Sequence, residues 1–488
     1  MNLIDEILKE TPDTKACRLG PGVTAQAAEM FRELFPSANR ALVVDDVNTR
    51  RVAGERVVAL LKQAGVEVSE LTVNPDGSWF HATYDKVEEV REAIERSQAT
   101  STSHSTSTSH SHSNYHSHSH SHSNSNSTLF PIAVGSGTIN DLVKRASEEL
   151  GLRYMVVGTA ASMDGYTSYG ASITKDGMKQ TLPCRAPLGA LVDTQVAAGA
   201  PREMTASGYA DLIAKIPAGA DWMLADAIAT ALPEMESHGC ERIHPLAWKC
   251  VQGPLRASLA NPSGVASGDE VEMRKLTEGL LMSAFAMQAS GTSRPASGTE
   301  HQVSHYWDME DLCFEGRPVS HGFKVGIGTL ISTATIEFLL AQELTSLDVE
   351  AAVAKWPRTF AELAATFPSV YGNRPDHIRR AESEMAKKYS TPDELRRELR
   401  FVKSAWPELA PKLRAQIMPF DEVRACLKAV GAPYEPEMIG VSRAKFRETY
   451  LGVPYMRLRY FSLDLVARLG LMDKLIDHLF GPNGVWRV

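Results

Sequence analysis

Short apolar runs alternate with amphipathic stretches through the first third of this chain, and this alternation limits the possible folds most. The strand-like runs are residues 41–45, 66–73, 131–134 and 154–157, and the helix-like stretches between them include 51–64 and 86–98. Strand and helix alternate at the spacing of βαβ units, in which a helix crosses over between two parallel strands. The sequence therefore predicts a parallel sheet with crossover helices.

The second half of the chain changes character. After about residue 191 the strand signals fade, and most segments have helical patterning. Thr391 is an expected N-cap, followed by proline at the first helical position and Glu394 three residues after the cap. Helical character continues over residues 420–430, 442–451 and 460–469, with Gly431 and Gly470 as expected helix stops. The predicted fold class is an α/β N-terminal part followed by an all-α C-terminal part.

Length and composition narrow the class of protein. A chain of 488 residues favours two or three domains, and 43% hydrophobic with 23% charged residues is typical of a soluble globular protein. The net charge of −8 argues against a general nucleic-acid binder. The chain has no run of 18 or more apolar residues, so we expect no membrane span. The first ten residues do not resemble a signal peptide, and six scattered cysteines indicate reduced thiols. We expect a cytoplasmic protein.

Residues 100–128 form a segment of unusual composition. Apart from Tyr115 they are all Ser, Thr, His and Asn, and they hold seven of the fifteen histidines. With so little apolar surface the segment is expected to be a disordered surface loop, inserted between a helix and the next strand. The alternative is a metal-buffering function for its histidines.

The first candidate site is a glycine turn where a strand meets a helix. Gly135, Ser136 and Gly137 follow the apolar run, and Ile139 begins the apolar stripe of a helix. Backbone N–H groups at such a turn can bind a pyrophosphate, but Asn140 stands where the full dinucleotide fingerprint has its third glycine. A plain strand-to-helix turn is equally compatible with this pattern.

A second candidate is the hydroxyl-rich string after the strand at 154–157. Thr159, Ser162 and Ser168 flank the carboxylate of Asp164 there, at the carboxyl end of a predicted strand. Ligands of open α/β sheets bind at this edge, although any one of these hydroxyls is as easily explained by a turn.

The third candidate is a set of imidazoles with one carboxylate. His301 and His305 are four residues apart, so they share one face of a helix, and His321 begins another apolar helix. Asp211 lies on a stretch of mostly apolar or small residues, where a carboxylate needs a partner. Imidazoles and a carboxylate are the usual ligands of a divalent transition metal such as zinc or nickel.

Four strings in order resemble one enzyme family. GSGTIND, TAASMDGYTS, ASGYADLIAK and SGTEHQVSHYWDM with a following SHG are similar to sn-glycerol-1-phosphate dehydrogenases, in the wider group of iron-type alcohol dehydrogenases, glycerol dehydrogenases and dehydroquinate synthases. The resemblance implies a Rossmann-like nucleotide-binding domain at residues 1–188, a helical metal- and substrate-binding domain at 189–345, and a helical extension at 346–488. It also implies reduction of dihydroxyacetone phosphate to sn-glycerol 1-phosphate with NAD(H) or NADP(H) and one divalent metal.

The resemblance assigns roles by position. The implied metal ligands are Asp211, His301 and His321, and the implied substrate contacts are Asp164, Asp211 and His305, of which Asp164 and His305 are the expected catalytic residues. The implied cofactor-binding residues are Asp46, Gly135, Ser136, Gly137, Thr138, Ile139, Asp141, Thr159, Ala160, Ala161, Ser162 and Ser168.

Several alternatives and lesser expectations accompany this hypothesis. A polyol dehydrogenase acting on unphosphorylated glycerol is the nearest rival, and a metal-storage protein is the rival from another class. Candidate cations for a substrate phosphate are Lys215, Arg294 and Lys324. Tyr455, Arg457, Arg459 and Tyr460 could form a partner surface, but we expect them rather to cover the core or to make a dimer contact. A small-molecule substrate is expected, and the protein is expected to be a homodimer.

Overall fold

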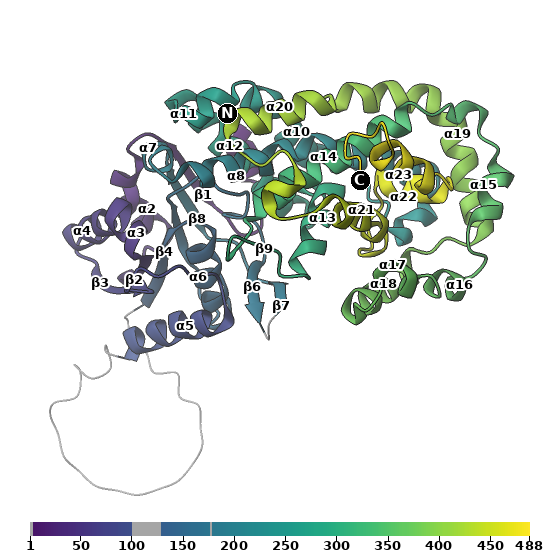
Figure 1. The fold of residues 1–488 in the computed structure, drawn as a ribbon. Helices are drawn as coiled ribbons and strands as arrows, with labels where there is room; N and C mark the ends of the chain where they lie inside the picture. Colours follow the sequence, from purple (N-terminus) through teal and green to yellow (C-terminus); the bar gives the residue numbers. More distant parts are fainter. Residues whose placement is uncertain (1–2, 100–127, 176–177) are drawn as a thin grey trace, which may run out of the picture. The chain divides into compact units, whose positions relative to one another are not determined.

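The computed structural model describes residues 3–99, 128–175 and 178–488 (Figure 1). The Ser/His-rich segment predicted to be disordered, residues 100–128, lies outside the described residues except for Thr128. Two compact units are present. The sheet unit comprises Thr11–Ala160 and Gly165–Ala200, and the helical unit comprises Met1–Glu10, Ala161–Asp164 and Pro201–Val488. The three-domain division with boundaries after residues 188 and 345 stays a prediction.

A six-stranded parallel sheet forms the centre of the sheet unit. Its order is β1-β8-β5-β4-β2-β3. The strands are β1 (Ala16–Gly20), β2 (Ala38–Asp46), β3 (Glu67–Val73), β4 (Thr128–Gly135), β5 (Met155–Gly158) and β8 (Gly189–Asp193). The four predicted strands are confirmed as β2 to β5, and the predicted fold class is confirmed with them. Sequence patterning missed β1 and β8, and also the hairpin β6 (Ala171–Lys175) and β7 (Met178–Leu182).

Helices cover both faces of this sheet because the crossovers run in opposite directions. The connection from β2 to β3 passes through α3 (Val47–Thr49) and α4 (Glu55–Gln63), whereas those leaving β3 and β4 pass through α5 (Tyr84–Ala99) and α6 (Gly137–Glu149) towards the other edge. With right-handed crossovers these two pairs lie on opposite faces. Helix α2 (Ala27–Leu34) joins α4 on its face, where their apolar side chains form one buried core with the strands.

The change of direction creates a switch point between β2 and β4. The chain moves from β2 outwards to β3, returns to β4 on the other side of β2, and continues through β5 to β8. Asp46 ends β2 and Gly135 ends β4, so both stand at the carboxyl ends of adjacent strands. Ligands of open α/β sheets bind at this position.

The helical unit is built around α14 (His321–Leu340). Other helices of this unit are α1 (Leu3–Ile7), α8 (Arg202–Ile213), α9 (Lys215–Ala231), α10 (Pro245–Leu259), α11 (Pro262–Ser267), α12 (Glu270–Ser290) and α13 (Thr299–Asp308), whereas α7 (Thr194–Ala198) belongs to the sheet unit. Helix α14 is long and apolar enough to cross a membrane by length and composition, yet 89% of its apolar window is buried inside the protein. Burial against α8, α13 and α20 accounts for that composition.

The rest of the helical unit follows α14 in the chain. Its helices are α15 (Val349–Lys355), α16 (Phe360–Ala364), α17 (Phe367–Tyr371), α18 (Pro375–Lys388), α19 (Pro392–Gln416), α20 (Phe420–Val430), α21 (Arg443–Gly452), α22 (Ser462–Arg468) and α23 (Met472–Phe480). The predicted capping box of Thr391 and Glu394 is confirmed, and Gly431 and Gly470 adopt the left-handed conformation expected of helix stops. One short strand pair, β9 (Cys313–Phe314) with β10 (Arg317–Pro318), interrupts the helices.

Candidate metal and nucleotide sites

Asp211, His301 and His321 come together in the helical unit from three separate helices. Each offers one ligand atom, and these atoms all lie within 4.8 Å of one another. Asp211 Oδ1 is 3.4 Å from His301 Nε2, and the two imidazole rings have centroids 5.3 Å apart. Asp211 and His301 are buried. One carboxylate and two imidazoles at this spacing are a donor set that suits a divalent transition metal.

Two glycines allow the three helices to approach so closely. A Cβ on Gly322, next to His321, would lie 1.9 Å from the main-chain oxygen of Ser207 in α8. A Cβ on Gly208, in the same helix as Asp211, would lie 1.9 Å from the main-chain oxygen of Ala161. Any side chain at either position would force the backbones apart, so the glycines set the distance between the candidate ligands.

Asp164 and Lys215 adjoin the cluster. Lys215 Nζ lies 2.6 Å from Asp211 Oδ1 and 2.9 Å from Asp164 Oδ2, and the main-chain N–H of Asp164 donates to Asp211 Oδ2 at 3.0 Å. The hydroxyl of Ser283 in α12 donates to Asp164 Oδ2 at 2.8 Å. Lys215 therefore neutralises two buried carboxylates at once. Its spacing of four residues from Asp211 was visible in the sequence, whereas Ser283 could not be distinguished there from many other hydroxyls.

Asp211 and Lys215 are both charged near neutral pH. Burial alone would raise the pKa of Asp211, but the ammonium of Lys215 and the two imidazoles hold it well below its usual range. Burial also opposes the charge of Lys215, yet the carboxylates of Asp164 and Asp211 raise the pKa of Lys215 above its usual value. Asp211 is thus an ionised carboxylate, as a metal ligand must be.

His305 lies one turn beyond His301 in α13 but has a different environment. Its side chain is 45% exposed, and Nδ1 is 3.6 Å from Asp308 Oδ2. Partial replacement of water by the surrounding protein lowers the pKa of His305, and the positive charge of Arg457 lowers it further, against the opposing effect of Asp308. A largely neutral, accessible imidazole can accept or pass a proton.

The glycine turn in the sheet unit has the geometry of a close strand-to-helix connection. Gly135 ends β4, and α6 begins at Gly137, with Ser136 as its N-cap, so Thr138 and Ile139 lie in the first turn. A Cβ on Gly135 would lie 2.6 Å from Cβ of Ile139. The N-terminus of α6 is therefore held at the carboxyl end of β4, where its N–H groups can bind an anion.

The two carboxylates predicted to bind cofactor both have structural partners. Asp46 Oδ1 accepts the N–H groups of Asn48 and Thr49 at 2.8 and 2.9 Å as the N-cap of α3. Asp141 Oδ2 accepts the N–H of Ser172 at 3.1 Å, and Oδ1 lies 3.4 Å from Lys144 Nζ. These contacts hold loops at the carboxyl edge of the sheet, so both residues shape that edge.

The predicted hydroxyl-rich string is divided by the unit boundary. Thr159 and Ala160 continue from β5 in the sheet unit, and the N–H of Thr159 donates to the main-chain oxygen of Gly135 at 3.2 Å. Ala161 and Ser162 belong with Asp164 to the helical unit, and Ser168 is back in the sheet unit. The same short string therefore supplies residues next to the glycine turn and the carboxylate next to Lys215.

Burial tests several lesser expectations. Arg294 is fully buried and donates to the main-chain oxygens of Tyr460 and Asp221 at 3.0 and 2.6 Å, so its guanidinium is structural. Arg459 and Tyr460 are also buried, as expected if they cover the core rather than form a partner surface. The described residues include all six cysteines, and no disulfide joins them, as predicted.

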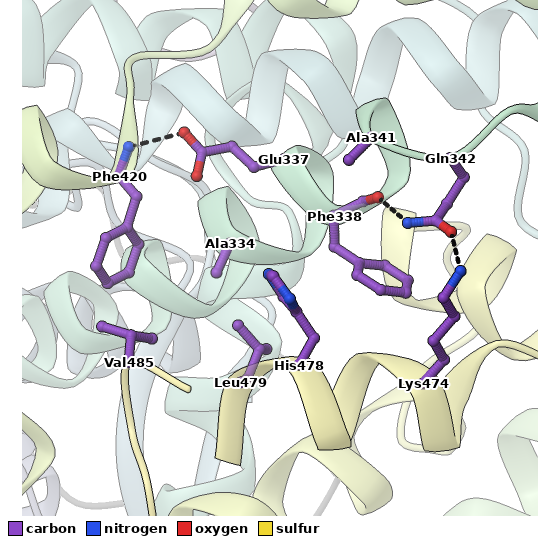
Figure 2. A pocket seen from close by; sticks show the side chains of 10 residues that line it. All are labelled: Ala334, Glu337, Phe338, Ala341, Gln342, Phe420, Lys474, His478, Leu479 and Val485. Atoms are coloured by element: carbon purple, nitrogen blue, oxygen red, sulfur yellow. Dashed lines mark hydrogen bonds between the residues drawn. The ribbon is translucent and has the colours of Figure 1, made fainter. Parts of the chain in front are cut away.

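A cavity of about 340 Å³ opens elsewhere in the helical unit (Figure 2). Residues of the C-terminal half of α14 and just after it line the cavity, together with residues of α23, Phe420 and Val485, and the lining is mostly apolar. Glu337 in its wall accepts the main-chain N–H of Phe420 at 2.9 Å. No candidate ligand lines this cavity, which therefore lies apart from the metal cluster.

Comparisons with known proteins find relatives of this chain. A family model described as iron-containing alcohol dehydrogenase matches residues 80–201. A glycerol-1-phosphate dehydrogenase, NAD(P)+, of Bacillus velezensis is 30% identical over 305 residues, covering 62% of this chain and 68% of the relative. The protein of the same name from Bacillus licheniformis is 28% identical over 449 residues, covering 92% of this chain and 88% of the relative. Some other relatives of this name are covered over only 47% of their length.

Solved structures support the fold. Glycerol dehydrogenase from Schizosaccharomyces pombe superposes with a TM-score of 0.54 at 14% identity, covering 95% of this chain and 90% of that chain. At this identity the likeness concerns the fold alone, a parallel sheet followed by helices. The sequence similarity shows that the chain belongs to the glycerol-1-phosphate dehydrogenase family.

Proposed function

We propose that this protein is an oxidoreductase that reduces dihydroxyacetone phosphate to sn-glycerol 1-phosphate, reversibly, with NAD(P)H and a divalent metal. The observation that supports this best is the cluster of Asp211, His301 and His321, each brought by a different buried helix to within 4.8 Å of the others. Relatives named glycerol-1-phosphate dehydrogenase supply the substrate of the proposal.

Asp211, His301 and His321 would hold the cation, which we propose to be zinc or nickel. Three protein ligands leave positions open for substrate, as catalytic metal sites require. A divalent metal bound there supplies a Lewis acid for the ketone oxygen. The ionised Asp211 offsets part of the cation's charge, while Lys215 and the hydroxyl of Ser283 hold Asp164 in place for a substrate contact.

The proposed nucleotide site is the carboxyl edge of the sheet around Gly135 and Asp46. Main-chain N–H groups from Ser136 to Ile139 would bind the pyrophosphate, and the hydroxyl of Thr159 and the backbone of Ala160 would border the nicotinamide. NAD(P)H supplies the hydride when bound. Asp164, the carboxylate proposed to contact the substrate, follows Ala160 by four residues in the chain.

His305 is proposed to move the proton that the reduction consumes. Its ring is accessible, and its lowered pKa keeps much of it neutral, so it can exchange protons with solvent. Reduction of a ketone to an alcohol takes up one hydride and one proton. We propose that His305 takes up a proton from solvent and passes it, directly or through water, to the substrate oxygen.

A phosphorylated substrate also needs cationic donors, and two are linked to His305, one through Asp308 and one through its charge. Lys324 is buried and pairs with Asp308, the same residue that neighbours His305. Arg457, from the segment before α22, acts on His305 through its charge and donates to the Ser293 hydroxyl at 3.0 Å. We propose that Lys324 and Arg457 favour the phosphorylated ketone over the neutral one.

The deciding experiment follows oxidation of NADH and NADPH with dihydroxyacetone phosphate and with dihydroxyacetone, after chelation and reloading with zinc or nickel. The proposal expects kcat/KM to be far higher for the phosphorylated ketone and chiral analysis to give sn-glycerol 1-phosphate. A preference for dihydroxyacetone would instead indicate a polyol dehydrogenase, and activity that survives full chelation would contradict a catalytic metal.

We also propose a cytoplasmic homodimer. The absence of a disulfide among the described cysteines and the burial of α14 support the location. Light scattering on the purified protein tests the oligomeric state.

A further inference from the structure

Glu300, which directly precedes His301, contacts the side of that imidazole away from the proposed cation. Its Oε1 lies 2.9 Å from His301 Nδ1, and both side chains are buried. The other ring nitrogen, Nε2, lies 3.4 Å from Asp211 Oδ1. Because an ionised carboxylate only accepts hydrogen bonds, this contact places a proton on Nδ1, so Nε2, on the Asp211 side, is the nitrogen that can bind a cation when it carries no proton.

Glu300 is itself held in one position. Oε1 also accepts the main-chain N–H of Gly298 at 2.5 Å. A Cβ on Gly298 would lie 2.8 Å from Glu300 Oε2 and 2.7 Å from Asp221 Oδ2, so the chain passes between two carboxylates where only hydrogen fits. Oε2 of Glu300 is buried and has no hydrogen-bond partner among the described residues. Keeping such a carboxylate buried is costly unless a positive charge nearby offsets it.

The second carboxylate, Asp221, fixes the start of the helix that carries these residues. Its Oδ2 accepts the N–H and the hydroxyl of Thr299, both at 2.8 Å. Its Oδ1 accepts the N–H of Ser462 at 2.7 Å, at the beginning of α22. Buried hydrogen bonds therefore run from α22 through Asp221 to the first turn of α13, where Glu300 and His301 stand.

We propose that Glu300 is a positioning residue, which fixes the tautomer and orientation of His301 for metal binding, and that Asp221 links this support to the C-terminal region. The inference rests on the proposed function in one respect, that His301 is a ligand of the cation. Carboxylates that accept from the second nitrogen of a ligating imidazole raise its basicity, and losing one typically lowers metal affinity about 10- to 100-fold. Through the hydrogen bond from Ser462 to Asp221, the region after residue 345 would help to hold Glu300 and His301 in position.

The test measures Zn²⁺ affinity by competition with a chromophoric chelator, together with the visible spectrum of the Co²⁺-loaded protein. Glu300→Gln keeps an acceptor without charge and should weaken Zn²⁺ binding about 10-fold, and Glu300→Ala about 100-fold with altered Co²⁺ bands. Asp221→Asn should weaken binding less than Glu300→Ala. Glu337→Gln is the matched control, because Glu337 lies near the other end of α14 from His321 and should leave both readouts unchanged (Figure 2).

The outcomes separate this inference from the proposed reaction. Wild-type affinity for Zn²⁺, to within twofold, in both Glu300 variants overturns the positioning role and leaves the proposed reaction standing. An equal loss in Glu337→Gln also overturns it, because the loss would then be general destabilisation. If Glu300→Ala does not fold, Glu300→Gln decides alone. Wild-type protein that binds neither Zn²⁺ nor Co²⁺ overturns the metal site and the inference together.

Discussion

Replacing Lys215 by methionine should make the stability of the helical unit depend on metal. Lys215 is the shared counter-charge of Asp164 and Asp211, at 2.9 and 2.6 Å, and all three residues are buried. Methionine keeps most of the volume and removes the charge. In metal-free protein the two carboxylates then repel each other with no cation beside them, whereas a divalent cation at Asp211 would restore the missing positive charge.

The expected size follows from the burial of these groups. Removing one partner of a buried ion pair costs about 3–5 kcal/mol. At about 2 °C per kcal/mol for a large domain, metal-free Lys215→Met should unfold about 6–10 °C below metal-free wild type. Saturating Zn²⁺ should recover most of this difference, so the rise in Tm on adding metal should be larger in the variant than in wild type.

Lys388→Met is a matched control for this experiment. Lys388 is a buried lysine in the same unit, but its partner is Asp464, which is not one of the candidate ligands. That variant should lose stability equally with and without Zn²⁺, as followed by thermal unfolding in chelator and in excess metal. If the metal-induced rise in Tm is the same in Lys215→Met, Lys388→Met and wild type, the cation does not bind beside Asp211 and the reasoning is refuted.

Three further predictions follow from single contacts. Gly322→Ala places a Cβ 1.9 Å from the main-chain oxygen of Ser207, so it should displace His321 and reduce bound metal, as measured by elemental analysis. Gly135→Ala should weaken NADH binding, measured by nucleotide fluorescence, because the turn into α6 must open. Burial raises the pKa of Asp45 to about 6, partly opposed by hydrogen bonding and a nearby arginine, so the folded state binds a proton that the unfolded state releases near pH 4. The contribution of this group to stability therefore falls as the pH rises from about 4 to 6. Between pH 4 and 7 the free energy of unfolding of Asp45→Asn, measured in urea, should rise by about 3 kcal/mol relative to that of wild type.

For each of these predictions one result would contradict the reasoning. Gly253→Ala is the control for Gly322→Ala, because no atom outside its own helix backbone lies within 4 Å of the added Cβ, and it should retain metal. If Gly322→Ala retains as much metal as this control, the close contact between α8 and α14 does not determine the geometry of the site. Unchanged NADH affinity in Gly135→Ala would argue against the glycine turn as the pyrophosphate site. A pH-independent difference between Asp45→Asn and wild type would mean that folding does not raise the pKa of Asp45.

The fold could be predicted where hydrophobic patterning is strong. Strands β2 to β5 are continuous or alternating apolar runs, and α20 spans Phe420–Val430 as its pattern indicates. The other strands carry weaker signals. Strand β1 contains Arg18 and is only partly buried at the sheet edge, and β8 begins with Gly189 and Ala190. Neither has the β-branched or aromatic density by which a strand is recognised.

The candidate site could be predicted by residue type but not by contact. Asp211, His301 and His321 were recognisable because carboxylate and imidazole are metal ligands, and the structure brings them together. Lys215 was expected near a substrate phosphate, yet it lies between two carboxylates, one of them 51 residues away in the chain. Contacts over such separations depend on tertiary packing, which local patterns do not contain.

The central claim is that Asp211, His301 and His321 hold one divalent cation needed for reduction of dihydroxyacetone phosphate. Metal content and NADH oxidation measured on the same preparations of wild type and His301→Ala test it most directly. We expect about one metal ion per chain and turnover in wild type, and loss of both in a folded His301→Ala that still binds NADH. A variant that keeps its metal and turns over normally would contradict the account.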